Sequence, residues 1–153
     1  TDFAKEALFN ILNNYYYFDE LSVLDLFAGT GNISYEFASR GCPSLIAVDS
    51  HSGCVQFINK TARELDYPIT VLKADVYEYL KRTVQRFDVI FADPPYELPI
   101  EKFTEIAEFV FERDFLNENG TLIIEHSSRT DLSNLPHFVN SKKYGGCVFS
   151  MFE

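Results

Sequence analysis

The residues best suited to chemistry in this chain are the four of Asp93-Pro94-Pro95-Tyr96. They directly follow Phe87 to Ala92, an apolar run that predicts a buried parallel strand. Such a strand would deliver them to the carboxyl edge of a sheet, where open α/β sheets bind ligands. Because proline fixes φ and lacks an N–H, the Pro94 carbonyl is held rigidly and is free to accept a hydrogen bond. A carboxylate, a carbonyl and a flat ring together suit a planar amine.

A second candidate site lies earlier in the chain. Gly29-Thr30-Gly31 stands between a predicted strand and a predicted helix, where small residues let a ligand approach the backbone and the helix start can face an anion. Asp49 ends the next predicted strand about 18 residues later, close to the spacing at which an acid binds ribose hydroxyls. A G-x-G turn alone is weak evidence, since many turns carry two glycines for conformational reasons. Together with Asp49 it predicts a site for a nucleoside-containing cofactor.

The charges of this region favour S-adenosylmethionine over NAD. A dinucleotide site usually has a third glycine where this chain has Ser34, and Asp25 lies near the end of the first predicted strand. A cofactor with a sulfonium cation, one carboxylate and an adenosine would tolerate Asp25 and give its ribose to Asp49. Asp75 could accept a hydrogen bond from the adenine amine, with Val76 packing nearby. Asp75 could also cap the helix that begins at Val76, and the two roles are compatible.

Strands and helices alternate along the chain. Helices are predicted over residues 3–13, 32–40, 54–65, 76–84 and 100–115. Strands are predicted over residues 22–27, 45–49, 69–73, 87–92, 121–125, 138–140 and 147–152. The last two would form a hairpin across residues 142–146, after an Asn119-Gly120 turn before the fifth strand. This pattern predicts one α/β domain over residues 1–153, with a doubly wound, Rossmann-like, mostly parallel seven-stranded sheet and an antiparallel C-terminal hairpin.

Composition limits the possible functions. The formal net charge of −10 argues against nucleic-acid binding, which normally relies on lysines and arginines. Much of the acid, however, recurs at helical spacing on one predicted helix, which indicates a solvated face: Glu101, Glu105, Glu108 and Glu112. The three cysteines are widely spaced and odd in number, and the three histidines are far apart, so neither a disulfide framework nor a metal site is expected.

No apolar run approaches the roughly 20 residues needed to cross a bilayer, and the first residues do not resemble a signal peptide. We therefore expect a cytoplasmic monomer with no membrane partner. Tyr15-Tyr16-Tyr17-Phe18 is more typical of core packing at a helix end than of a patch that stacks on RNA. Glu125-His126-Ser127-Ser128 would end the fifth strand at the same edge as Asp93, which leaves a contact with the substrate open.

The order of these motifs resembles the class I S-adenosylmethionine-dependent methyltransferases that act on exocyclic or amide nitrogens. The resemblance rests on residues 23–31, then Asp49, Asp75 and residues 93–96. Within that class the chain resembles the RsmD family of 16S ribosomal RNA guanine-N2 methyltransferases, and residues 1–10 are similar to the helix that follows the family's Arg-Pro-Thr segment. The resemblance implies that a basic amino-terminal segment typical of the family is missing here.

The resemblance also implies roles for individual residues. The S-adenosylmethionine site would comprise Asp25, Phe27, Ala28, Gly29, Gly31, Asp49, Ser50, Asp75 and Val76. Asp93 and the Pro94 carbonyl would accept hydrogen bonds from the guanine N2 amine, which localises its lone pair, while Pro95 and Tyr96 would contact the base. The implied partner is ribosomal RNA or the small ribosomal subunit.

Two alternatives remain open at this point. Related Asp/Asn-Pro-Pro-Tyr sites methylate adenine N6 in nucleic acids or glutamine in proteins, although no target-recognition domain for DNA is apparent. A Rossmann-like module that binds a nucleoside without catalysis would be the alternative from a different class.

Overall fold

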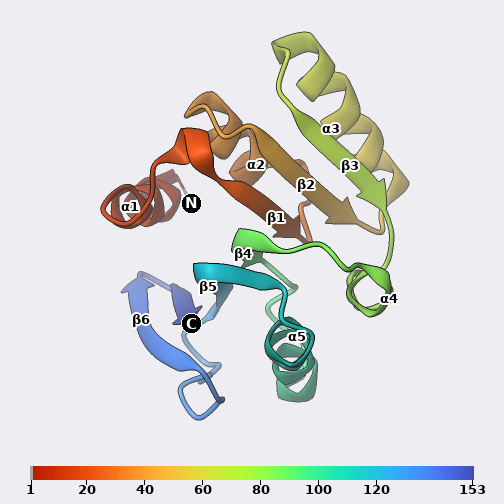
Figure 1. Cartoon of the computed structure of the whole chain (residues 1–153). Coiled ribbons are helices and arrows are strands. Elements are labelled where there is room, and N and C mark those ends of the chain that lie inside the picture. The colour runs from red at the N-terminus through yellow and green to blue at the C-terminus, as the bar shows by residue number, and fades with distance from the viewer. Residues whose placement is uncertain (1) are drawn as a thin grey trace.

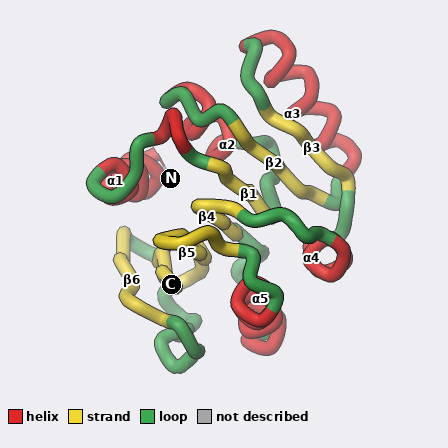
Figure 2. The backbone as a smooth tube through the Cα atoms, viewed as in Figure 1, coloured by secondary structure: helices red, strands yellow, loops and turns green. Residues whose placement is uncertain are grey.

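The computed structural model describes residues 2–153 and contains a single seven-stranded sheet covered by helices (Figures 1 and 2). The helices are α1 Asp2–Asn13, the 3-10 helix η1 Phe18–Glu20, α2 Asn32–Ser39, α3 Ser52–Leu65, α4 Val76–Arg82 and α5 Ile100–Glu112. The strands are β1 Ser22–Leu26, β2 Ser44–Asp49, β3 Ile69–Lys73, β4 Phe87–Ala92, β5 Leu116–Ser127, β6 Phe138–Tyr144 and β7 Cys147–Phe152.

The sheet has the strand order β3-β2-β1-β4-β5-β7-β6. Strands β1 to β5 run parallel, whereas β7 lies antiparallel between β5 and β6. The predicted doubly wound sheet with an antiparallel C-terminal hairpin is therefore confirmed. Successive strands move outward from β1 to β3 and then return to β4, so the order reverses between β1 and β4. Open α/β sheets bind ligands at such a reversal, beyond the carboxyl ends of the strands.

Two apolar cores fill the two faces of the sheet. On one face α1, η1 and α2 pack on the sheet, and the rings of Phe9 and Phe37 meet edge to face with their centroids 4.7 Å apart. On the other face α4 and α5 cover the sheet with residues such as Leu80 and Phe103 (Figure 1). These two cores fix the positions of the strand ends, and hence of the candidate site residues that follow them.

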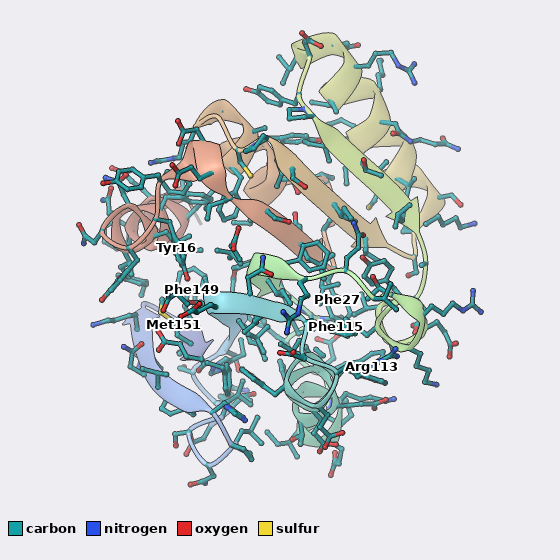
Figure 3. The ribbon with its side chains drawn as sticks, viewed as in Figure 1. Tyr16, Phe27, Arg113, Phe115, Phe149 and Met151 are labelled. Carbon is teal, nitrogen blue, oxygen red and sulfur yellow. The ribbon has the colours of Figure 1, made fainter. Side chains whose placement is uncertain are left out.

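The side chain of Arg113, at the end of α5, contacts the backbone of α4 (Figure 3). Its Nη1 donates to the carbonyl of Leu80 at 3.2 Å, and its guanidinium lies 5.5 Å from the Phe115 ring centroid. The helix predicted to reach Phe115 ends instead at Glu112, because Asp114 adopts a left-handed φ of 59° that breaks the helix.

The structure corrects two boundaries near the carboxyl-terminal half. Asn119 and Gly120 do not form a turn before a strand; they lie inside β5, with Asn119 at a φ of 65°, where the pairing with β4 shifts register. This is the behaviour of a β-bulge. Strand β6 also continues to Tyr144, so only Gly145 and Gly146 form the hairpin turn. The polar residues that suggested a loop, such as Lys142, belong to an exposed edge strand, where charge discourages pairing with other chains.

Candidate active site

The glycine turn after β1 is built from left-handed backbone. The strand ends at Leu26 rather than at Phe27, because Phe27 has a φ of 57° and leaves the ladder. Gly29 and Gly31 follow with φ of 57° and 92°. A Cβ on Gly31 would lie 2.8 Å from Cζ of Tyr35, so this position accepts only glycine, whereas a Cβ on Gly29 would meet open space. The turn therefore brings bare backbone to the start of α2.

Asp49 ties this turn to the neighbouring strand. Its Oδ2 accepts the N–H of Gly29 at 2.8 Å, and its Oδ1 accepts the N–H of His51 at 2.9 Å. Each carboxylate oxygen can accept one further hydrogen bond. The backbone N–H of Ala74 donates to the Asp49 carbonyl at 3.0 Å, so Asp75 follows β3 at the same edge of the sheet.

Asp25 is a buried carboxylate with one side-chain partner. It is 2% exposed, and the Oγ of Ser34 donates to its Oδ2 at 2.7 Å. Burial raises the pKa of Asp25 to about 7, and the negative charge of Asp49 contributes to the increase. Ser34 was singled out in the sequence only as a missing glycine. Its hydroxyl in fact supplies the hydrogen bond that keeps a carboxylate inside the first strand.

A cavity of about 230 Å³ opens beside the glycine turn. Its lining consists of Asp25, Phe27, Ala28, Gly29, Thr30, Asn32, Ile33, Phe91 and Asp93. Four of the nine residues predicted to bind the cofactor, Asp25, Phe27, Ala28 and Gly29, are among them. Figure 3 shows Phe27 beyond the end of β1, and its ring packs edge to face against Tyr77 at 6.3 Å between centroids.

The other five predicted cofactor residues lie outside this lining. Gly31 is the N-cap residue before α2, and Asp49 acts on the turn through Gly29. Asp75 caps α4, since its Oδ2 accepts the N–H of Glu78 at 3.1 Å. Val76 is 3% exposed and belongs to the core. Ser50 is exposed beyond the end of β2, and none of Ser50, Asp75 and Val76 lines either cavity that contains Asp93.

Asp93, together with Asn32 and Ile33, lines both this cavity and a second one. The second cavity has a volume of about 170 Å³ and is lined by Asp2, Ala4, Lys5, Asn32, Ile33, Asp93, Glu125 and Phe149. The backbone N–H of Asp93 donates to the Leu26 carbonyl at 3.3 Å, which fixes the end of β4 against β1. Desolvation, together with the charges of Glu125 and Asp25, raises the pKa of the Asp93 carboxyl to about 7.

Tyr96 turns its hydroxyl toward the β5 and β7 side of Asp93. Tyr96 is 46% exposed, and the nearby Cys147 Sγ donates to Glu125 Oε2 at 3.4 Å. Desolvation raises the pKa of the Tyr96 hydroxyl to about 12, so the phenol stays neutral. Pro94 is buried beneath the turn, while Pro95 is exposed and its carbonyl accepts the N–H of Leu98 at 3.0 Å.

The second cavity contains residues that the sequence did not single out as functional. Asp2, Ala4 and Lys5 come from α1, and Asn32 and Ile33 from α2. Phe149 comes from β7 and is labelled in Figure 3. These elements are far apart in the chain, and no local motif marks them. Only the position of Glu125 at the end of the fifth strand signalled a possible contact.

The three histidines and Tyr16 have structural roles. His51 caps α3 by accepting the N–H of Cys54, His126 bonds Ser150 at 2.7 Å, and His137 stacks on a phenylalanine ring. Tyr16 bonds the carbonyl of Asn119 at 2.7 Å, at the opposite end of β5 from the site. Within residues 2–153, no group of three or more histidine, cysteine, aspartate or glutamate side chains could hold a metal ion. The described helices are also too short or too polar to cross a membrane.

The described part of the chain has three free cysteines, Cys42, Cys54 and Cys147. Burial raises the pKa of Cys42 to about 11 and that of Cys147 to about 12, so these two thiols remain protonated at neutral pH.

Comparison with known proteins places the chain in a family. A model of the family described as Conserved hypothetical protein 95 matches residues 1–153. YlbH of Bacillus subtilis, provisionally named an rRNA methyltransferase, is 33% identical over 137 residues, which cover 86% of this chain and 72% of YlbH. Ribosomal RNA small subunit methyltransferase D of Buchnera aphidicola subsp. Baizongia pistaciae is 26% identical over 84% of this chain, which spans only 64% of that relative's length.

The solved structures include the Thermus thermophilus 16S rRNA N2 methyltransferase RsmC, in complex with AdoMet and guanosine. It superposes with a TM-score of 0.77 at 21% identity, covering 98% of this chain and 42% of RsmC. This likeness shows the fold. With the family match over the whole chain and the YlbH relationship, it confirms the resemblance found in the sequence: the chain belongs to the Conserved hypothetical protein 95 family of RsmD-like methyltransferases, with a class I fold.

Proposed function

We propose that this protein transfers a methyl group from S-adenosylmethionine to the exocyclic N2 amine of a guanine in small-subunit ribosomal RNA. The observation that carries the proposal is the position of Asp93, on the wall shared by two cavities. One cavity borders the glycine turn, where a nucleoside cofactor suits the bare backbone. The other borders α1, β5 and β7, where a base would be held. A methyl donor and an amine acceptor would therefore meet at Asp93.

The cofactor cavity suits a cation with a nucleoside. S-adenosylmethionine supplies a methyl carbon on a positively charged sulfur, and the carboxylates of Asp25 and Asp93 line the same cavity. A cation there would favour their ionised forms. Asp49 has acceptor capacity left for ribose hydroxyls, and Asp75 has one carboxylate oxygen that does not accept the capping hydrogen bond. These residues fit the cofactor that the sequence predicted.

The acceptor side suits a planar amine. Hydrogen bonds from the guanine amine to the Asp93 carboxylate and the Pro94 carbonyl would direct its lone pair at the methyl carbon, and a charge-assisted bond contributes about 1.5–3 kcal/mol. As the nitrogen–carbon bond forms and the sulfur–carbon bond breaks, the amine becomes cationic and releases a proton. Asp93 is suited to receive it because its pKa of about 7 exceeds that of an ordinary carboxyl. Tyr96 would stack on the base, which contributes roughly 1–3 kcal/mol.

The relatives support the substrate class. The Buchnera relative is named a small-subunit ribosomal RNA methyltransferase, and RsmC holds guanosine together with AdoMet. The acidic face of α5 is compatible with RNA binding because α5 covers the face of the sheet opposite α1 and its acids line neither cavity that contains Asp93. Glu108 and Glu112 border a separate groove there, beside Phe111 and His137.

The test is a methyl-transfer assay with product mapping. The protein is incubated with methyl-labelled S-adenosylmethionine and with small ribosomal subunits, or naked 16S rRNA, from a strain that lacks it, and the RNA is digested to nucleosides. We expect label in N2-methylguanosine. Label in N6-methyladenosine or in protein glutamine would replace the proposed substrate, and no binding of S-adenosylmethionine by calorimetry would indicate a non-catalytic module.

A matched pair of variants tests the role of Asp93. Asp93→Ala should retain cofactor affinity within a few fold and lose methyl transfer by about 100-fold or more, as expected for a group that acts in the transition state. Glu118→Ala is the control, since Glu118 is an exposed acid near the other end of β5. Equal loss of binding and transfer in Asp93→Ala would show that Asp93 is structural.

A further inference from the structure

Glu125 occupies a place in the second cavity that the proposed function leaves unexplained. It lies two residues before the end of β5, where it pairs in register with Phe149 of the antiparallel strand β7. Its carboxylate shares the lining of this cavity with Asp93. The Glu125 side chain is half-buried, and Cys147 donates to its Oε2 at 3.4 Å. The carboxylate is therefore held at the cavity wall.

Three acids line this cavity, Asp2, Asp93 and Glu125, and the ammonium of Lys5, which also lines it, lies 3.7 Å from Glu36. Asp93 and Glu125 therefore suit a ligand that supplies hydrogen-bond donors. The negative charge of Glu125 contributes to the raised pKa of Asp93, so the two carboxylates lie close enough to repel each other. The cavity is about 170 Å³, which leaves little room for water to separate them from a bound base. A ligand that presents two neighbouring N–H donors on one edge would satisfy both carboxylates at once.

Guanine has this edge. Its N1–H and its N2 amine are adjacent donors, whereas adenine presents one amine next to a ring nitrogen that only accepts. We propose that Glu125 accepts the N1–H of the target guanine while Asp93 accepts its N2 amine, and that Glu125 thereby selects guanine over adenine. This inference rests on the proposed function and assigns its base specificity to one residue. An adenine in the same position would set its N1 lone pair against a carboxylate, which is an uncompensated repulsion.

A neighbour of Glu125 holds it for this role. The Cys147 thiol donates to one oxygen, which restricts the orientation of the carboxylate. The second carboxylate oxygen, Oε1, remains to accept from the base. Sites built around a hydrogen bond reject analogues that lack the partner by up to about 10⁴-fold, because a buried polar group is left unpaired.

The experiment uses RNA in which the guanine mapped by the methyl-transfer assay is replaced by 2-aminopurine. This base keeps the 2-amino group but has an acceptor at N1. The wild-type protein should methylate 2-aminopurine RNA at least about 10-fold more slowly than guanine RNA, measured as kcat/KM. Glu125→Gln should lower kcat/KM for guanine RNA by about 10- to 100-fold. It should also reduce the ratio of kcat/KM on guanine RNA to that on 2-aminopurine RNA, because the new amide can donate to N1 of 2-aminopurine.

Controls separate specificity from folding. Glu118→Gln makes the same chemical change at an exposed position of the same strand and should keep the wild-type preference. Affinity for S-adenosylmethionine, measured by calorimetry, should be unchanged in both variants because Glu125 does not line the cofactor cavity.

The results of these assays distinguish a failure of the role of Glu125 from a failure of the proposed function. Equal rates on guanine and 2-aminopurine in the wild-type protein would overturn the role of Glu125, whether or not Glu125→Gln folds. If a folded Glu125→Gln variant still preferred guanine over 2-aminopurine RNA as strongly as the wild type, the role of Glu125 would also be overturned. The proposed function would then be unaffected. Absence of any labelled guanine in the mapping assay would overturn the proposed function, and this inference with it.

Discussion

The backbone N–H of Gly29 donates a 2.8 Å hydrogen bond to Oδ2 of Asp49. This bond joins the turn after β1 to the end of β2, so the acid expected to bind ribose also shapes the loop that would border the rest of the cofactor. Replacing Asp49 should therefore have two effects: it removes the expected hydrogen bond to ribose, and it removes the hydrogen bond that holds the Gly29 loop.

Asp49→Ala should weaken binding of S-adenosylmethionine by about 10- to 100-fold, which corresponds to one or two lost hydrogen bonds to a charged group. Isothermal titration calorimetry measures the change. Glu64→Ala is a suitable control, because Glu64 is an exposed acid on α3 whose lysine partner lies 4.0 Å away. Wild-type affinity in Asp49→Ala would exclude Asp49 from the cofactor site.

The two glycines of the turn should differ in their tolerance of a side chain. Gly31→Ala places a Cβ 2.8 Å from the ring of Tyr35 at a φ of 92°, and should cost roughly 2–4 kcal/mol of unfolding free energy from overpacking and strain together. Gly29→Ala meets open space at a φ of 57° and should cost only about 1 kcal/mol. Urea unfolding compares the two variants, and equal losses would contradict the steric argument.

Methyl transfer should depend on the ionisation of Asp93. Its pKa of about 7 means that the carboxylate is protonated below this pH and ionised above it. The value of kcat/KM should therefore rise as the pH increases through about 7 and level off above it. Glu125→Gln removes a negative charge that raises the pKa of Asp93, so the rising limb should move to lower pH. A profile that is flat across this range would show that Asp93 does not act as the ionised acceptor.

Asp25 should make folding stability depend on pH. Its pKa rises from 3.8 to about 7 on folding, so the folded protein binds this proton more tightly than the unfolded chain. The resulting stability is complete below about pH 4 and is lost as the pH rises through about 7. Asp25→Asn keeps an acceptor for Ser34 and removes the buried charge. It should therefore gain at most about 4 kcal/mol over the wild type near pH 8 and little near pH 4.

Denaturant unfolding at these two pH values measures the effect. Ser34→Ala is the matched variant, because it removes the hydroxyl that donates to Asp25 at 2.7 Å. It should lower the free energy of unfolding by about 1–3 kcal/mol, most strongly where Asp25 is ionised. A gain in Asp25→Asn that is the same at both pH values would contradict the role of the buried charge.

Local patterns were sufficient to predict much of this molecule. Apolar runs such as Phe87 to Ala92 identified the parallel strands, and the glycine turn with Asp49 and Asp93 identified their carboxyl edge. These features depend on residues that are close in sequence, or on the general rule that places parallel strand ends together. The capping role of Asp75 was likewise readable from its position before a helix.

The rest depends on register and on distant contacts. The bulge at Asn119 follows from how β5 pairs with β4, and Asn-Gly is equally compatible with a turn. The contact between Glu125 and Cys147 arises only because β7 runs antiparallel beside β5. Composition gives no signal for either arrangement, nor for the contribution of Lys5 on α1 to the second cavity.

The reversed direction of β7 has an implication for how the family could diversify. Because β7 runs opposite to β5, its first residue Cys147 and the Gly145–Gly146 turn stand at the edge where the parallel strands finish, as the bond from the Ser128 N–H to the Gly146 carbonyl shows. The proposed cofactor cavity is lined by β1, the turn after it, the start of α2 and the end of β4, whereas the proposed base cavity also takes Phe149 from β7. Changes in the length or the side chains of the β6–β7 hairpin could therefore alter which substrate is methylated without altering the residues of the cofactor cavity.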